Sequence, residues 1–187
     1  MTAAPGSPAG GVIWLTGLSG VGKTATGTAL VERIRADGTS CVLLDGDAVR
    51  DAVRDASLGH DRESRLLNAY RISRLSRMLA RQDVLVVVST MSLFHEIHAW
   101  NRRNLPAYFE VLLEAHLAVL KQRDPKGLYR RAAAGDESHV AGVNLEYAAP
   151  KHPDLRVRTD AAATGVEAVA EQIRLAWQAR GAQGSPA

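Results

Sequence analysis

The chain has 187 residues, of which 46% are hydrophobic and 23% are charged, and its formal net charge is +3. This length supports one well-cored domain, and the modest charge with 5% aromatic residues argues against a nucleic-acid binder. A single cysteine, Cys41, excludes an intramolecular disulfide and a zinc site built from cysteines, and it is expected to be a small buried side chain.

The two ends of the chain differ in composition from the part between them. Residues 1–10 and 181–187 are rich in Ala, Gly, Pro and Ser, which predicts disordered tails around a single domain over 11–180. The first residues lack the basic and apolar regions of a signal peptide, and no apolar run reaches the roughly 20 residues of a membrane span. We therefore expect a cytoplasmic protein with no membrane partner.

Short apolar runs alternate with helical patterns along this domain. In chain order, strands are predicted at GVIWLTG, CVLLDGD, DVLVVVS, YFEVLLEA and LRVRT, and helices at 23–36, at 64–82, around His95 and His98, around Leu117 and Leu120, and at 165–178. The continuous run DVLVVVS is typical of a strand buried on both faces. This alternation predicts a three-layer α/β fold, with a parallel sheet of about five strands flanked by helices.

The stretch 124–153 fits neither the helical nor the strand period. It is rich in Gly, Pro, Arg and polar residues and contains DPKGLYRRAAAGDE. A segment of this length inside a compact domain is more often a functional lid than a simple connector. We therefore expect 124–153 to form a lid over a binding site.

A phosphate-binding motif follows the first predicted strand. Residues 17–24, GLSGVGKT, match G-x-x-x-x-G-K-[ST] at the point where a strand gives way to a helix. The glycines let backbone N–H groups turn toward phosphate oxygens, and the helix N-terminus adds partial positive charge. Lys23 would reach the β- and γ-phosphates, and the Thr24 hydroxyl would bind Mg²⁺. The predicted ATP-binding residues are Gly17, Ser19, Gly20, Val21, Gly22, Lys23, Thr24 and Ala25.

The acidic residues of the predicted site come after the second strand. The run DVLVVVS ends in Ser89, where a motor or switch ATPase normally has a carboxylate, and LLDGDAVR instead supplies Asp45, Asp47 and Arg50. A loop at the carboxyl edge of a parallel sheet faces the bound phosphates, so a carboxylate there can orient a hydroxyl and Mg²⁺ and accept a proton. The alternative is a DG turn followed by a helix with its N-cap at Asp47.

Two histidines on the helix after DVLVVVS raise the question of a metal site. His95 and His98 lie three residues apart, which places them on one helical face. Because the sequence shows no third ligand near them, we expect an exposed or capping role.

With these motifs the chain resembles the adenylylsulfate (APS) kinase family over nearly all of residues 12–160. The family patterns GLSGxGKS/T, LDGDxxR, L-G-F-S-x-x-D-R-x-x-N, S-F-I-S-P-F and DPKGLY correspond here to GLSGVGKT, LDGDAVR, LGHDRESRLLN, STMSLF and RDPKGLY. The resemblance implies transfer of the γ-phosphoryl group of ATP to the ribose 3′-hydroxyl of a second nucleotide. It implies Lys23, Asp47 and Lys126 as catalytic residues, and Thr24 with Asp47 as ligands of Mg²⁺.

The resemblance also implies an acceptor site. Arg65 and Asn68 share a helical face, and an Arg fork suits a phosphate or sulfate oxygen while an amide suits a sugar or base edge. Lys126 would close over the phosphates from the lid. The predicted acceptor-binding residues are Asp45, Asp47, Arg50, His60, Arg65, Asn68, Ser89, Lys126 and Val140.

Two positions depart from the family pattern at the acceptor base. The family holds the adenine of APS between the Phe of L-G-F and an aromatic residue of the lid, whereas this chain has His60 and Val140. Stacking on an aromatic side chain contributes about 1–3 kcal/mol per base, so purine affinity should fall. This side branch also resembles the cytidine diphosphoramidate kinases. The sequence therefore predicts cytidine diphosphoramidate or a similar pyrimidine nucleotide as the acceptor, with APS as the alternative.

Two other classes of protein were compared with this kinase prediction. A non-catalytic nucleotide-binding protein is disfavoured because Lys23, Thr24, Asp47 and Lys126 are all present. A nucleic-acid kinase is disfavoured because the chain has no basic stripe. The expected partners are ATP with Mg²⁺ and a small nucleotide acceptor, and the chain could form a homodimer.

Overall fold

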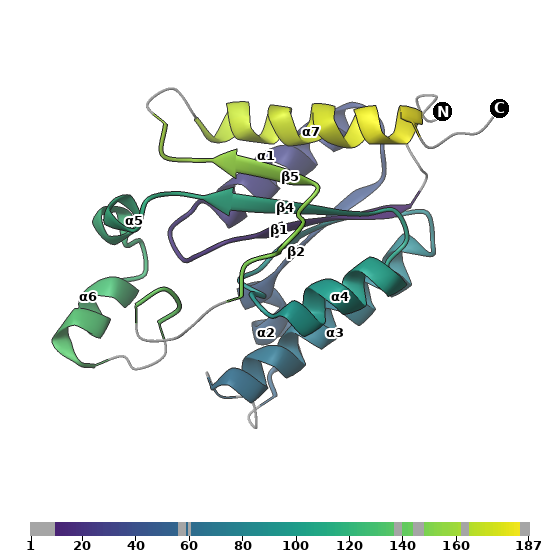
Figure 1. The fold of residues 1–187 in the computed structure, drawn as a ribbon. Coiled ribbons are helices and arrows are strands. Elements are labelled where there is room, and N and C mark those ends of the chain that lie inside the picture. The colour runs from purple at the N-terminus through teal and green to yellow at the C-terminus, as the bar shows by residue number, and fades with distance from the viewer. Residues whose placement is uncertain are drawn as a thin grey trace.

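The computed structural model describes residues 10–55, 59, 61–136, 140–143, 148–161 and 165–183. Five parallel strands form one sheet in the order β2-β3-β1-β4-β5 (Figure 1). The strands are β1 (Gly11–Thr16), β2 (Cys41–Asp45), β3 (Leu85–Ser89), β4 (Tyr108–Glu114) and β5 (Leu155–Arg158). The predicted parallel α/β sheet is confirmed.

Helices cover both faces of the sheet. They are α1 (Lys23–Ala36), α2 (Gly46–Val53), α3 (Arg62–Ala80), α4 (His95–Asn104), α5 (Leu117–Arg123), α6 (Leu128–Ala134) and α7 (Val166–Gln183). Helices α1 and α7 lie on one face and α3 and α4 on the other, while α5 and α6 lie beyond the carboxyl ends of β1 and β4 (Figure 1). Within the described ranges, none of the helices is long and apolar enough to cross a membrane.

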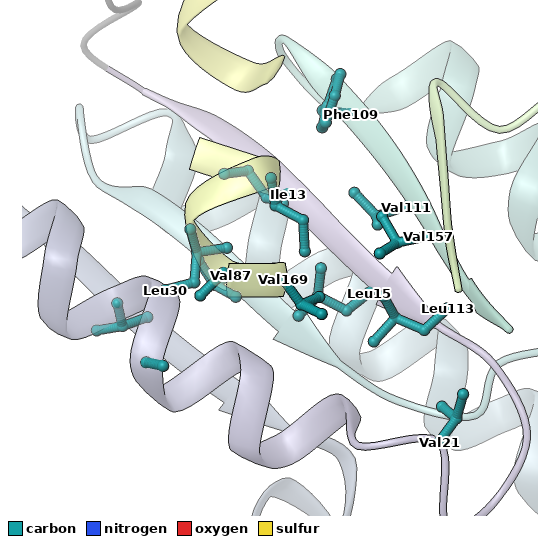
Figure 2. Close-up of a cluster of buried hydrophobic side chains, with 14 of the residues drawn as sticks. Ile13, Leu15, Val21, Leu30, Val87, Phe109, Val111, Leu113, Val157 and Val169 are labelled. Atoms are coloured by element: carbon teal, nitrogen blue, oxygen red, sulfur yellow. The ribbon is translucent and has the colours of Figure 1, made fainter. Parts of the chain in front are cut away.

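The alternation of side chains along β1 divides the core into two clusters. Ile13 and Leu15 pack with α1 and α7 on one face (Figure 2), and Val12 and Trp14 pack with α3 and α4 on the other. All four side chains are fully buried, as expected for a central strand covered on both faces. The two cores hold the carboxyl ends of the strands in place, and the loops that follow these ends form the site.

The predicted lid contains a helix that the sequence pattern did not indicate. Helix α6 lies within 124–153, between Gly127 at φ 64° and Gly135 at φ 84°. The Asp124 carboxylate accepts hydrogen bonds from the N–H groups of Tyr129 (3.1 Å) and Arg130 (3.0 Å), which satisfies two free donors at the start of α6. Seven residues make about two turns, too few to produce a clear period.

Cys41 at the start of β2 is expected to be unreactive in the folded protein. Its side chain is 4% exposed, and burial raises the pKa of its thiol to about 12. At pH 8 only about one thiol in ten thousand is then ionised, and the thiolate is the reactive form. We expect an aromatic disulfide reagent to label Cys41 at least about a hundredfold faster in denaturant than in the native protein. Rapid labelling of the native chain would contradict this burial.

Candidate active site

The loop between β1 and α1 has the backbone of a phosphate cradle. Gly17, Gly20 and Gly22 have φ angles of 150°, 78° and 96°, which favour glycine. A Cβ on Gly17 would lie 2.4 Å from the carbonyl oxygen of Leu113, so only glycine fits between the loop and β4. The N-cap of α1 is Gly22, which has no side chain to accept hydrogen bonds from the first N–H groups of the helix. These N–H groups are therefore available to an anion bound at the start of α1.

Lys23 is folded over this loop. Its Nζ donates to the carbonyl oxygens of Gly17 and Leu18, both at 2.9 Å. Burial, together with the positive charge of Lys126, lowers the pKa of Lys23 to about 8. The ammonium therefore lies where an anionic ligand would stabilise its charged form, as expected of a lysine that binds phosphate.

The two aspartates after β2 have different surroundings. Asp45 is the N-cap of α2, and its Oδ1 accepts from the N–H groups of Asp47 (3.0 Å) and Ala48 (3.3 Å). Its Oδ2 accepts from the Thr24 hydroxyl at 2.8 Å, which ties the segment to the phosphate loop. The alternative that placed the N-cap at Asp47 is therefore wrong. Asp47 lies in the first turn of α2, and its side chain is 74% exposed.

The lid brings a lysine to this acidic segment. The Lys126 ammonium donates a hydrogen bond to Asp47 Oδ2, and its charge is also felt by Lys23. The three residues predicted to be catalytic thus meet in one place, although Lys126 lies 79 positions from Asp47 in the chain.

These elements surround an open cleft of about 790 Å³. The phosphate loop and the start of α1 form one wall, and the Asp45–Asp47 segment with α3 forms another. The predicted site residues that line the cleft are Ser19, Gly20, Gly22, Lys23, Thr24, Ala25, Asp45, Asp47, Arg50, Arg65, Asn68, Ser89 and Lys126. Gly17 and Val21 shape the loop from behind: Gly17 packs against β4, and Val21 is 1% exposed in the core.

Two buried polar atoms belong to residues that line the back of the cleft. Asn68 and Ser89 are 6% and 2% exposed. Within the described part of the chain, neither Asn68 Oδ1 nor Ser89 Oγ has a hydrogen-bond partner. Because an unpaired buried polar group is costly, both atoms are suited to a ligand that enters the cleft.

The first turn of α3 positions the arginines of the acceptor side. Asp61 caps this helix by accepting from the N–H group of Ser64 at 2.9 Å and from its hydroxyl at 2.7 Å. Arg50 Nη1 donates to the Gly59 carbonyl at 3.0 Å, which ties α2 to the start of α3. Arg65 is half-buried and, like Arg50, lines the cleft.

The two residues predicted to contact the acceptor base, His60 and Val140, are not found in the described lining of the cleft. His60 lies outside the described residues. Val140 is 4% exposed and packs in the core cluster of α1 and α7, and the described lining of the cleft does not include it. Burial of its branched apolar side chain thus places Val140 in the core rather than in the described lining, and its role as a base contact stays a prediction.

Phe94 also lines the cleft, although no site role was predicted for it from the sequence. Phe94 is the one aromatic side chain in the described lining of the cleft, and the Arg62 guanidinium lies 5.4 Å from its ring centroid. It directly precedes α4, as its N-cap. Phe94 ends the motif STMSLF, which begins at the carboxyl end of β3. Because ligands bind at the carboxyl edge of a parallel sheet, this position could have indicated that Phe94 lines the cleft.

A phosphate loop at the carboxyl edge of a parallel sheet, facing carboxylates and a lid lysine, defines a P-loop kinase. Residues 9–158 match the family model described as adenylylsulphate kinase, and the chain belongs to this family. It is a phosphotransferase that acts on a hydroxyl group of a nucleotide, like its homologues.

Named relatives and a solved structure agree with the family. The chain is 44% identical over 151 residues to the adenylyl-sulfate kinase of Deinococcus deserti, covering 81% of this chain and 83% of that protein. It is 38% identical over 143 residues to the cytidine diphosphoramidate kinase of Campylobacter jejuni, covering 75% and 81%. The APS kinase of Mycobacterium tuberculosis, solved with AMPPNP and APS, has a TM-score of 0.82 and 33% identity, covering 90% and 98%.

Proposed function

We propose that the protein transfers the γ-phosphoryl group of ATP to the ribose 3′-hydroxyl of APS. The observation that carries this proposal is a single cleft that holds the phosphate loop and Asp47 together with Arg65 and two polar groups that have no partner among the described residues. Adenylyl-sulfate kinases among the relatives, and a structural neighbour solved with APS, favour this acceptor over the pyrimidine nucleotide predicted from the sequence.

The donor side of the cleft suits ATP. The loop amides and Lys23 would hold the phosphates and stabilise the charge that develops on them. The Thr24 hydroxyl and the two carboxylates beside it are hard oxygen donors of the kind that bind Mg²⁺. Thr24 and Asp47 would hold the ion with Asp45 adjacent, and Mg²⁺ would neutralise charge on the β- and γ-phosphates.

The acceptor side of the cleft suits an attacking hydroxyl. Asp47 would orient the 3′-hydroxyl and accept its proton as the bond from O3′ to the γ-phosphorus forms and the bond to the bridging oxygen of ADP breaks. Lys126, which contacts Asp47 in the described structure, would move to the transferring phosphoryl group. Closure of the lid would exclude water and so limit hydrolysis of ATP.

Cytidine diphosphoramidate is the second candidate acceptor. His60 stands where the family pattern has Phe, and Phe94 alone supplies an aromatic wall in the described cleft. A cytidine diphosphoramidate kinase is also among the relatives.

A panel of acceptors tests the two candidates. The enzyme would be incubated with ATP, Mg²⁺ and either APS, CDP or cytidine diphosphoramidate, and mass spectrometry would identify the acceptor that gains a phosphate. We expect kcat/KM for APS to exceed that for either cytidine nucleotide by at least about tenfold. The reverse order would replace APS by the pyrimidine nucleotide, and transfer to none of the three would overturn both candidates.

Arg65→Ala is expected to weaken binding of the acceptor but not binding of ATP. Loss of a charge-assisted hydrogen bond costs about 1.5–3 kcal/mol of binding free energy, which corresponds to an increase of about tenfold to a hundredfold in the acceptor KM. The KM for ATP should stay within about twofold of wild type. Arg74→Ala is the matched control, because Arg74 is exposed on the same helix and does not line the cleft. Equal losses for both substrates in Arg65→Ala would remove Arg65 from the acceptor site.

A further inference from the structure

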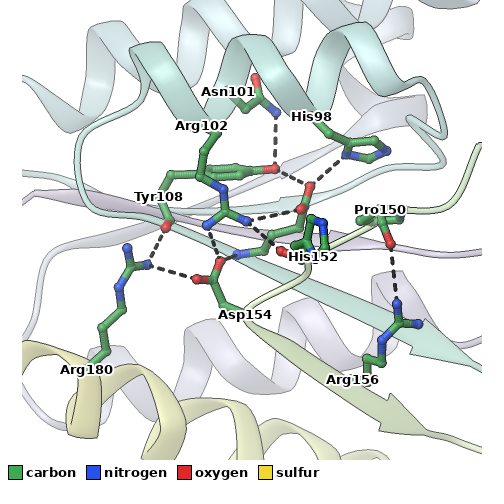
Figure 3. A network of polar contacts seen from close by, with 10 residues as sticks. His98, Asn101, Arg102, Tyr108, Pro150, His152, Asp154, Arg156 and Arg180 are labelled. Atoms are coloured by element: carbon green, nitrogen blue, oxygen red, sulfur yellow. Dashed lines mark hydrogen bonds and ion pairs between the residues drawn. The ribbon is translucent and has the colours of Figure 1, made fainter.

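A polar network with a buried centre joins α4, β4 and the chain that returns from the lid (Figure 3). At its centre is the Glu110 carboxylate, which is 3% exposed. Tyr108 OH donates to Glu110 Oε1 at 2.7 Å, and His98 Nδ1 lies 2.7 Å from the same oxygen. Although burial alone raises the pKa of Glu110, these hydrogen bonds hold it below its usual range. His98 is thus buried in this network, so the expected exposed or capping role is wrong for it, whereas His95 is exposed as expected.

Arg102 connects the three segments of the network. From α4, its Nη1 donates to Asp154 Oδ2 at 2.7 Å, and its Nη2 donates to Glu110 Oε2 and to the His152 carbonyl, both at 3.2 Å. Its guanidinium carbon lies 4.9 Å from the ring centroid of Tyr108. Figure 3 shows Arg102 and Arg180 approaching Asp154 from opposite sides. The Glu110 N–H group also donates to Asp154 Oδ2 at 2.7 Å, and Arg156 Nη2 donates to the Pro150 carbonyl at 3.4 Å. Residues 148–154 are therefore attached to the folded core by several bonds, of which Arg102 makes two, one to Asp154 and one to the His152 carbonyl.

The same segments lead into the cleft. Helix α4 begins directly after Phe94, which lines the cleft together with Ser92. The N–H group of Ala148 donates to the carbonyl oxygen of Leu93 at 3.1 Å, so the chain returning from the lid is bonded to the segment that carries these residues. A shift of α4 or of 148–154 would therefore move one wall of the cleft and the point where the lid rejoins the domain.

We infer that Arg102 is a positioning residue of the acceptor site. It fixes residues 148–154 against α4 and β4, and thereby fixes the position of Phe94 in the cleft wall and of the point where the lid rejoins the domain. The ion pairs of Arg102 add little net stability, because its side chain is 39% exposed and the desolvated Glu110 carboxylate offsets part of their attraction. The fixed fork of its guanidinium, bonded at once to Asp154, Glu110 and the His152 carbonyl, nevertheless specifies one arrangement of the three segments. Arg102 touches none of the reacting groups. The expected effect of Arg102 on acceptor binding rests on the proposed function, whereas its attachment of residues 148–154 to the core does not.

Limited proteolysis measures that hold directly. Lys151 is exposed, and the bond that follows it leads to His152, whose carbonyl accepts from Arg102. Trypsin requires the local chain to open, so cleavage after Lys151 reports how tightly the segment is held. We expect Arg102→Met to accelerate this cleavage at least about fivefold, as followed by mass spectrometry of the fragments. An unchanged rate would overturn the inference.

Arg174→Met is the matched control. Arg174 also bonds two carboxylates, Glu171 on its own helix at 2.7 Å and Asp37 at the end of α1 at 3.0 Å, and neither contact belongs to the cleft lining. This variant should leave the cleavage rate after Lys151 at the wild-type value. Equal acceleration in both variants would show a general loss of stability and would overturn a specific role for Arg102.

Steady-state kinetics separate positioning from stability. Arg102→Met should raise the acceptor KM about tenfold, leave the ATP KM within about twofold and increase ATP hydrolysis without acceptor, whereas Arg174→Met should change none of these. Arg102→Lys, which keeps the charge but loses the fork, should lie between wild type and Arg102→Met and also serves if the Met variant fails to fold. If wild type phosphorylates no acceptor, the proposed function fails, and the trypsin rates still decide the hold on 148–154. Equal changes in both KM values would overturn the positioning role.

Discussion

Asp47→Asn is expected to reduce kcat about a thousandfold, because a positioned proton acceptor contributes about 10²–10⁴ to the rate of transfer. Asp47 is the exposed carboxylate of the cleft, whereas Asp45 is occupied by Thr24 and by the first turn of α2. The amide keeps the shape of the side chain but accepts protons poorly. Binding of ATP should change by less than about threefold, because the loop amides and Lys23 remain and Thr24 still offers a ligand to Mg²⁺. Single-turnover rates and calorimetric titration with a non-hydrolysable ATP analogue measure the two effects.

Asp51→Asn provides the control for this prediction. Asp51 lies one turn further along α2, is exposed and does not line the cleft. Its amide variant changes the net charge by the same amount on the same helix, and its kcat should stay within about twofold of wild type. A kcat for Asp47→Asn within tenfold of wild type would remove Asp47 from the chemical step.

Lys126→Met is expected to reduce kcat about a hundredfold, the effect of removing one group that stabilises charge in a transition state. In the described structure this ammonium is bonded to Asp47, so it lies within reach of the site where the phosphoryl group would be transferred. Methionine keeps most of the length and apolar stem of lysine, so the fold of the lid should survive. Rapid-quench measurement of phosphoryl transfer with saturating ATP and acceptor would give the rate.

Lys121→Met is the matched control for the lid lysine. Lys121 is exposed on α5 and does not line the cleft. Its removal lowers the net charge equally and should leave kcat within about twofold of wild type. If Lys126→Met also kept the wild-type kcat, its bond to Asp47 would be a resting contact without a part in transfer.

Local sequence determined the parts of this protein that short segments specify by themselves. The β-branched run at 84–88 predicted a strand buried on both faces, and β3 is such a strand. The motif GLSGVGKT predicted the loop between β1 and α1, because its glycines allow backbone angles that other residues avoid. The same local patterns predicted the order of the strands and of the other helices, but α6 was too short to produce a period and α2 entered only as the alternative interpretation of the DGD segment.

Contacts between distant segments decided the rest. The bond between Lys126 and Asp47, the burial of Val140 in the core and the network around Arg102 all join residues separated by other elements of the chain. Motif resemblance suggested that Lys126 and Asp47 share a site but could not place Val140 or reveal the partners of Arg102. Such contacts depend on how the helices and the returning lid segment pack on the sheet. A one-dimensional pattern records which residues are apolar or charged, and the tertiary structure alone decides which of them meet.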